Sequence, residues 1–163
     1  MANEVSLIDC IEQETGKQIV MRGDIYVYFD TKKDVEAEII EKAIILKGEK
    51  DLKNAKDERN NEIKKSFAEE EKQNILIDGV DYQGGYDSAI KLDSAKRLSE
   101  SAGLETVTFY DAKNIGHDLS LVDANNIMLQ VAGKYQNDFK KLQSLKVLVD
   151  SAKTIKEVEL IVW

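Results

Sequence analysis

Proline is absent from this chain of 163 residues, although it supplies about 5% of an average protein. Proline ends or kinks helices because its ring clashes with the preceding turn and it lacks an N–H donor, so its absence permits long helices. Cys10 is the only cysteine, which excludes an intrachain disulfide and a thiolate metal cluster. We expect it to be a small buried hydrophobe. The chain also lacks any run of about 20 apolar residues that could cross a bilayer.

The chain has fewer basic than acidic residues. Lysine and arginine total 23 against 31 acidic residues, giving a net charge of −8. Because a basic face is needed to displace counterions from nucleic acid and to attract anionic lipid, we expect neither a nucleic acid nor a membrane as partner. The first residues lack a basic segment followed by an apolar run, so we expect no signal peptide and synthesis in a reducing cytoplasm. Hydrophobic residues at 42% and charged residues at 33% are typical of a folded chain with a solvated surface.

The composition and patterning predict an α+β protein in three parts, of which residues 1–30 are the first. Residues 5–11, 17–21 and 25–29 are short apolar runs separated by turn signals at Gly16 and Gly23. Aromatic and β-branched residues in the third run suit a pleated surface. This pattern predicts a small antiparallel meander of three strands.

Residues 31–74 are predicted to form a long charged helix. The segment opens with Thr31 and Asp34 at capping-box spacing. Between Lys47 and Lys72, eight basic and eight acidic residues leave little apolar surface to bury. Gly48 weakens the helix by up to about 1 kcal/mol relative to alanine, and marks a candidate break.

A helix this polar is stabilised by ion pairs between residues four apart and by a narrow apolar stripe that packs against other helices. Leu52, Ala55, Arg59 and Ile63 are spaced three, four and four, which favours a coiled coil between copies of the chain. The alternative is a solvated helix packed on its own chain. For the coiled coil, the predicted helix contacts are Ile39, Ile44, Leu52, Ile63 and Phe67.

Residues 75–163 are predicted to form a mostly helical domain with a β-hairpin. Asp78–Gly79 between apolar residues is a strong hairpin signal, because both turn positions need positive φ. Ile90, Leu92 and Leu98 are expected on the buried side of the next helix. Two further capping boxes, at Ser120 and Thr154, open a long amphipathic helix and a short last one. Trp163 is expected to close the core of its own domain; the alternative is that it anchors a partner.

This C-terminal part resembles a domain of unknown function found at the C-termini of tail-fibre and baseplate-region proteins of tailed bacteriophages. The resemblance covers about residues 56–163. It depends most on the ending Ala152, Thr154, Glu157, Ile161 and Trp163, which is similar to the family's A-x-T-x-x-E-x-x-x-I-x-W in order and spacing. The helix start at residues 86–88 matches less well because its serine comes early.

The resemblance implies a place and a task. The place is the virion tail of a phage or phage-like element, reached after synthesis in the host bacterial cytoplasm. The task is that of a non-enzymatic structural protein, an adaptor between baseplate and tail fibre that binds other tail proteins. The long charged helix predicts a homo-oligomer, and because phage fibres are trimeric we expect a trimer. The alternative is a tail-fibre assembly chaperone that is not retained in the virion.

Nothing in the sequence predicts a catalytic, cofactor or metal site. His117 is the only histidine, and its neighbours Asp118 and Ser120 are too close in sequence to form a triad, so we interpret it as a turn residue. Residues 111–118 have oxygen ligands and a glycine but carry Lys113 and Ile115 where an EF-hand needs side-chain oxygens. We interpret Gly84–Gly85 as a loop and residues 22–24 as a turn. We interpret residues 69–71 as a solvated helix face.

Overall fold

The computed structural model describes residues 6–163 and confirms the α+β class. Long helices alternate with three separate two-stranded antiparallel hairpins. The chain divides into two compact units, the first formed by residues up to Asn61 with Leu148–Val162, and the second by Glu62–Val147 with Trp163. This division falls inside two long helices, and not at the boundaries near residues 30 and 74 that the sequence suggested.

Unit 1 begins with a helix, α1 (Leu7–Thr15), where the sequence predicted the first strand of a meander. The prediction of a three-stranded meander is therefore wrong for its first strand. Val5, where that strand was predicted to begin, lies outside the described residues. Ser6 caps the helix by accepting a hydrogen bond from the N–H of Ile8, and Gly16 ends it in the left-handed conformation. Both ends of α1 are thus fixed by local side-chain and backbone chemistry.

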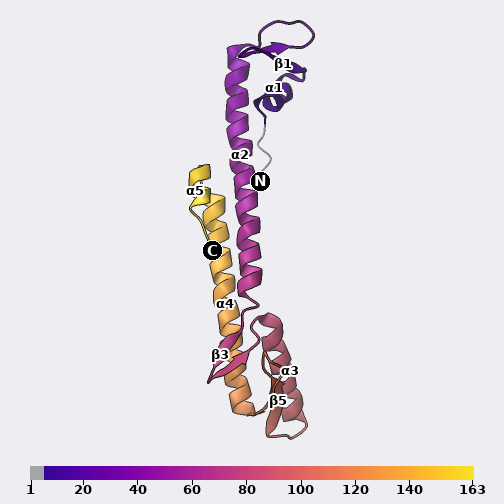
Figure 1. Ribbon diagram of the computed structural model, residues 1–163, viewed down its shortest axis with the longest axis vertical. Helices are drawn as coiled ribbons and strands as arrows, with labels where there is room; N and C mark the ends of the chain where they lie inside the picture. Colours follow the sequence, from indigo (N-terminus) through magenta and orange to yellow (C-terminus); the bar gives the residue numbers. More distant parts are fainter. Residues whose placement is uncertain (1–5) are drawn as a thin grey trace. The chain divides into compact units, whose positions relative to one another are not determined.

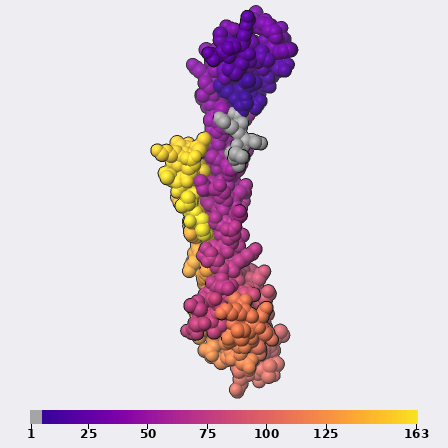
Figure 2. All heavy atoms as spheres, viewed as in Figure 1, coloured from indigo at the N-terminus to yellow at the C-terminus, as the bar shows by residue number. Residues whose placement is uncertain are grey.

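The other two predicted strands are present as the hairpin β1 (Ile19–Arg22) and β2 (Ile25–Tyr28). Helix α1 and this hairpin pack on the first turns of α2 (Ala37–Glu70), as Figure 1 shows. Their indigo atoms form a compact mass around that end of the helix in Figure 2. The core of this part joins buried residues from all four elements and from the link before α2: Cys10, Ile11, Ile19, Tyr28, Val35 and Ala43.

Helix α2 begins at Ala37 and not at the capping box predicted from Thr31. The intervening residues extend the hairpin: Val35 donates its N–H to the carbonyl of Tyr26, and Lys32 takes a left-handed φ of 57°. The hydroxyl of Tyr28 donates to the Glu36 carboxylate at 2.7 Å. These non-local hydrogen bonds keep residues 31–36 out of the helix.

No break occurs at Gly48, because α2 runs through it without interruption. Unit 1 is completed by the end of α4 (Leu121–Ser151) and by α5 (Ile155–Glu159). The capping box predicted at Thr154 is confirmed, since its hydroxyl accepts from the N–H of Glu157 while the Glu157 carboxylate accepts from the N–H of Thr154. Helix α5 buries Val158.

Unit 2 contains two hairpins and two helices around a second core. The hairpins are β3 (Ile75–Ile77) with β4 (Val80–Tyr82), and β5 (Thr106–Tyr110) with β6 (Gly116–Ser120). They pack with α3 (Tyr86–Ser101) and the part of α4 before Leu148, which Figure 1 shows gathered together. The buried residues of this core are Ile77, Tyr82, Ala89, Leu92, Val107, Ala124, Ile127 and Val131.

The turn predicted at Asp78–Gly79 is confirmed, with φ of 51° and 82° at its two positions. The capping box predicted at Ser120 is confirmed only in its first half, because the hydroxyl oxygen accepts from the N–H of Asp123 at 3.1 Å. The Asp123 carboxylate accepts from the Ser120 hydroxyl at 2.6 Å. The buried side of α3 was predicted only in part. Leu92 is buried, but Ile90 and Leu98 are 45% and 72% exposed, because α3 carries apolar residues on more than one face.

Candidate functional site

The six residues predicted to make contacts lie in different environments. In unit 1, Ile39 is half-buried against the core, Leu52 is half-buried, and Ile44 is 53% exposed. In unit 2, Ile63 is buried, and Phe67 is half-buried in a cluster of aromatic rings that includes the sixth residue, Trp163.

The aromatic cluster is centred on Phe67, near the end of α2. Its ring centroid lies 6.1 Å from that of Tyr135, 6.2 Å from Phe139 and 6.0 Å from Trp163, mostly in tilted or edge-on geometry. Aromatic pairs at these separations are worth about 0.5–1.5 kcal/mol beyond the area they bury. The ammonium group of Lys141 lies 4.4 Å from the Trp163 ring. Trp163 is half-buried and contacts the Phe67 ring of its own unit, but it is not among the core residues of unit 2, so its closing of a core stays a prediction.

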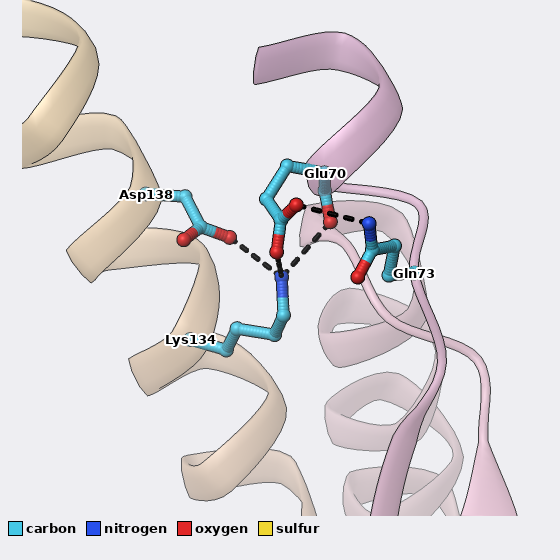
Figure 3. A network of polar contacts seen from close by, with 4 residues as sticks. All are labelled: Glu70, Gln73, Lys134 and Asp138. Atoms are coloured by element: carbon cyan, nitrogen blue, oxygen red, sulfur yellow. Dashed lines mark hydrogen bonds and ion pairs between the residues drawn. The ribbon is translucent and has the colours of Figure 1, made fainter. Parts of the chain in front are cut away.

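A polar network lies beside this cluster and holds the end of α2 against α4 in unit 2 (Figure 3). The ammonium group of Lys134 donates to the backbone carbonyl of Glu70 at 2.9 Å and to the Asp138 carboxylate at 2.7 Å. It also lies 3.5 Å from the Glu70 carboxylate, which accepts from the Gln73 amide. A cation at the carboxyl end of a helix interacts favourably with the helix dipole and with carbonyls that lack helical partners.

In unit 1 the cations come from α2 itself. The ammonium group of Lys56 donates to the carbonyl of Asp150, and the guanidinium of Arg59 donates to the carbonyl of Glu159 at 3.4 Å. Within each unit, then, the second half of α2 contacts its own chain through cations or rings. This is the alternative that the sequence left open beside the coiled coil. The oligomer itself stays a prediction.

An open groove of about 280 Å³ runs between α3 and α4 in unit 2. The rings of Tyr86 and Tyr135 lie at one end with centroids 5.2 Å apart. The Nε of Arg97 binds the Asp93 carboxylate at 2.7 Å, and both residues line the groove. The remaining lining is mainly apolar: Ala89, Ile90, Met128 and Ala132, with Gln136.

Sequence reasoning missed this groove because it assigned Ile90 to the buried side of α3. A signal was available. The exposed Tyr86 and Ile90 are four residues apart, and so are Met128 and Ala132, which places each pair on one helix face. A smaller cavity of about 180 Å³ lies beside the β3–β4 turn and the start of α4, with both Asp78 and Asp123 in its lining.

His117 lies in strand β6, paired with Phe109, and is half-buried, so its interpretation as a turn residue is wrong. Its Nε2 lies 3.1 Å from Oδ2 of Asp111, which is 5% exposed. Oδ1 of Asp111 accepts from the N–H groups of Lys113 and Ile115 at 2.8 and 2.9 Å. The hydrogen bond from Ile115 is the main cause that lowers the pKa of Asp111 below its ordinary value, with His117 and Lys113 adding to it and burial opposing it. This arrangement organises the β5–β6 turn.

Two other motifs lie in a turn and in a link between elements. Residues 22–24 lie at the β1–β2 turn, where Arg22 pairs with Ile25. At Gly84 a β-carbon would stand 2.1 Å from the carbonyl oxygen of Gln73, so this glycine permits a close backbone approach. Among residues 6–163, no group of three or more potential ligand side chains could hold a metal ion. In the same range, no helix is both long enough and apolar enough to cross a membrane.

Comparison with protein-family models, with curated proteins and with solved structures gave no match to this chain.

Proposed function

We propose that this protein is a non-enzymatic structural component of a bacteriophage or phage-like tail, where it acts as an adaptor between baseplate and fibre. The tail assignment depends on the resemblance of residues 152–163 to the ending of the phage tail domain. The adaptor role depends on the surface of the folded chain, which is suited to binding other proteins.

The observation that carries the adaptor role is the exposure of large apolar side chains on helix surfaces. Ile45 is 64% exposed on α2, Leu98 is 72% exposed on α3, and Leu129 is 56% exposed on α4. Single exposed apolar residues are ordinary, whereas contiguous exposed apolar patches mark sites where a protein or ligand binds. In unit 2, Tyr86 and Ile90 are about half exposed along the α3–α4 groove.

The proposal is tested by asking whether the protein stays in the finished particle. The chain is tagged in the genome that encodes it, particles are purified by density gradient, and their proteins are quantified by mass spectrometry. A tail component is expected at a fixed ratio to the tail proteins. Deleting the gene should give particles that lack fibres in electron micrographs.

The same experiment separates the chaperone. An assembly chaperone would be found with fibre protein in the lysate but would be missing from purified particles. Particles that form normally, carry fibres and infect without the gene product would count against both roles.

A further inference from the structure

We propose that the cavity between the β3–β4 hairpin and the start of α4 binds a short primary alkylammonium group, carried by a small amine or by a lysine side chain of another protein. All residues that line this cavity belong to unit 2. The site does not depend on the tail assignment, so its test can fail while the proposed function stands, and the reverse also holds.

The cavity is small and partly apolar. Its volume is about 180 Å³, below the roughly 300–1,000 Å³ of pockets that hold drug-sized molecules. Because a molecule of liquid water takes about 30 Å³, the cavity holds about six heavy atoms of that size. Its apolar lining comes from the hairpin, from β6 and from α4: Ile77, Val80, Leu119 and Ile127. The ligand is therefore a short chain with an apolar part.

The charged groups of the lining are both negative. Asp78 stands at the hairpin turn and Asp123 in the first turn of α4. Of the residues that the structure describes, no basic one lines the cavity, and neither carboxylate forms an ion pair. Asp123 accepts only the hydroxyl of Ser120, at 2.6 Å. Two carboxylates that no cation balances attract a positive ligand, more strongly beside apolar walls than in water.

The observation that points to a ligand is the hydroxyl of Tyr82. This residue lines the cavity and is only 2% exposed, yet its hydroxyl has no hydrogen-bond partner among residues 6–163. Nearly all buried polar side chains in proteins have a partner. The pKa of Tyr82 is raised, first by burial and then by the negative charges of Asp111 and Asp78. The hydroxyl therefore stays neutral and lies in a negative field that favours a cationic partner.

A primary ammonium group suits these acceptors. It has three N–H donors, and the lining offers two carboxylates and the Tyr82 hydroxyl oxygen. Asn126 and Gln130 add amide oxygens on the same face of α4 as Asp123. A bare metal ion fits less well, because residues 6–163 contain no group of three or more potential ligand side chains. It would also leave the apolar lining uncovered, which an alkyl chain covers.

The test titrates the isotope-labelled full-length chain with butylamine at neutral pH and follows the amide shifts by NMR. Butylamine is expected to shift the amides of Gly79, Tyr82 and Asn126 with a dissociation constant on the order of 1 mM, because so few heavy atoms bind weakly. Butan-1-ol has the same chain without the charge and is expected to bind about tenfold more weakly. Acetyl-lysine methylamide separates the two sources: shifts at the same amides indicate a lysine side chain, and shifts with butylamine alone indicate a free amine.

Two substitutions each remove one contact. Tyr82→Phe deletes only a hydroxyl without a protein partner, so the packing of the ring is kept. Asp78→Asn removes a charge, and asparagine tolerates the left-handed φ of 51° at this position. Each is expected to raise the dissociation constant for butylamine about tenfold. The matched control is Asp81→Asn, which removes the same charge from the same hairpin at a position that does not line the cavity. It is expected to bind as the wild type does.

Urea midpoints check that all variants are folded. The proposal is overturned if butylamine gives no saturable shift at these amides, or if butan-1-ol shifts them at the same concentrations. It is also overturned if Tyr82→Phe binds butylamine as tightly as the wild type, or if Asp78→Asn and Asp81→Asn weaken binding equally.

Discussion

Replacing Gly84 with alanine tests the close backbone approach between the end of α2 and the start of α3. Gly84 lies in the link between β4 and α3. A β-carbon built there would be 2.1 Å from the Gln73 carbonyl oxygen and 3.1 Å from the Glu71 carbonyl oxygen. Both obstacles are backbone atoms, so no side-chain rotation relieves the clash. Either the Gln73 segment or the Gly84 link must move.

The size of the effect follows from that displacement. The added methyl group must gain about 1 Å of clearance, and overpacking of this kind costs about 1–3 kcal/mol. We expect Gly84→Ala to destabilise unit 2 by about 2 kcal/mol. For a chain of this length, that corresponds to a fall of about 4–8 °C in the melting temperature.

The assay is urea unfolding followed by the fluorescence of Trp163, the only tryptophan, whose ring contacts Phe67 in the same unit. The control is Gly133→Ala in α4, where a β-carbon would meet nothing within 4 Å. Because alanine is a better helix former than glycine by up to about 1 kcal/mol, this substitution should raise the free energy of unfolding. The two substitutions add the same atom and should act in opposite directions. If Gly84→Ala is as stable as the wild type, the steric reasoning is refuted.

Three further predictions concern other contacts of unit 2. Lys134→Met should lower the free energy of unfolding, measured by urea titration, by about 1–2 kcal/mol. The reason is that the Glu70 carbonyl loses a charge-assisted hydrogen bond that is only partly shielded from water. An unchanged urea midpoint would contradict this. Phe67→Ala should lower the free energy of unfolding by about 2–3 kcal/mol, which is less than the loss expected for a fully buried ring because Phe67 is half-buried. It should also shift the Trp163 fluorescence emission to longer wavelength, because the two rings are in contact. Emission that stays at the wild-type wavelength would count against the contact. Because folding lowers the pKa of Asp111, its stabilising contribution is complete above the ordinary value of 3.8 and is lost as pH falls toward the lowered pKa. The stability difference between wild type and Asp111→Asn should therefore shrink on acidification below pH 4, and a difference that grows would refute the assignment.

Local sequence signals predicted the hairpin turn and the helix caps. Asp78 and Gly79 take positive φ, and Ser120 and Thr154 cap their helices, as their residue types and spacing indicated. Each of these features depends on atoms within a few residues, so the sequence alone contains the physical cause.

The errors near the N-terminus arose where local patterns were ambiguous. A short apolar run such as residues 7–11 fits a buried strand or one face of a helix equally well, and Ser6 with Gly16 decided for the helix. At Thr31 the capping pattern was present, but two hydrogen bonds outweighed it: Val35 donates its N–H to the Tyr26 carbonyl, and the Tyr28 hydroxyl donates to the Glu36 carboxylate. Those partners lie more than two helical turns apart in sequence, beyond the reach of a capping pattern.

By itself, the sequence determined that the chain would be rich in long helices, with hairpins where glycine and aspartate permit positive φ. It also determined that α2 carries too little apolar surface to be stable unsupported. Only the tertiary structure decided what supports that helix: carbonyls at the ends of α4 and α5 for Lys56 and Arg59, and aromatic rings around Phe67. The physical reason is that helix periodicity and capping act within one or two turns. The packing partner of a charged helix, in contrast, depends on groups brought together from 64 to 100 residues away along the chain.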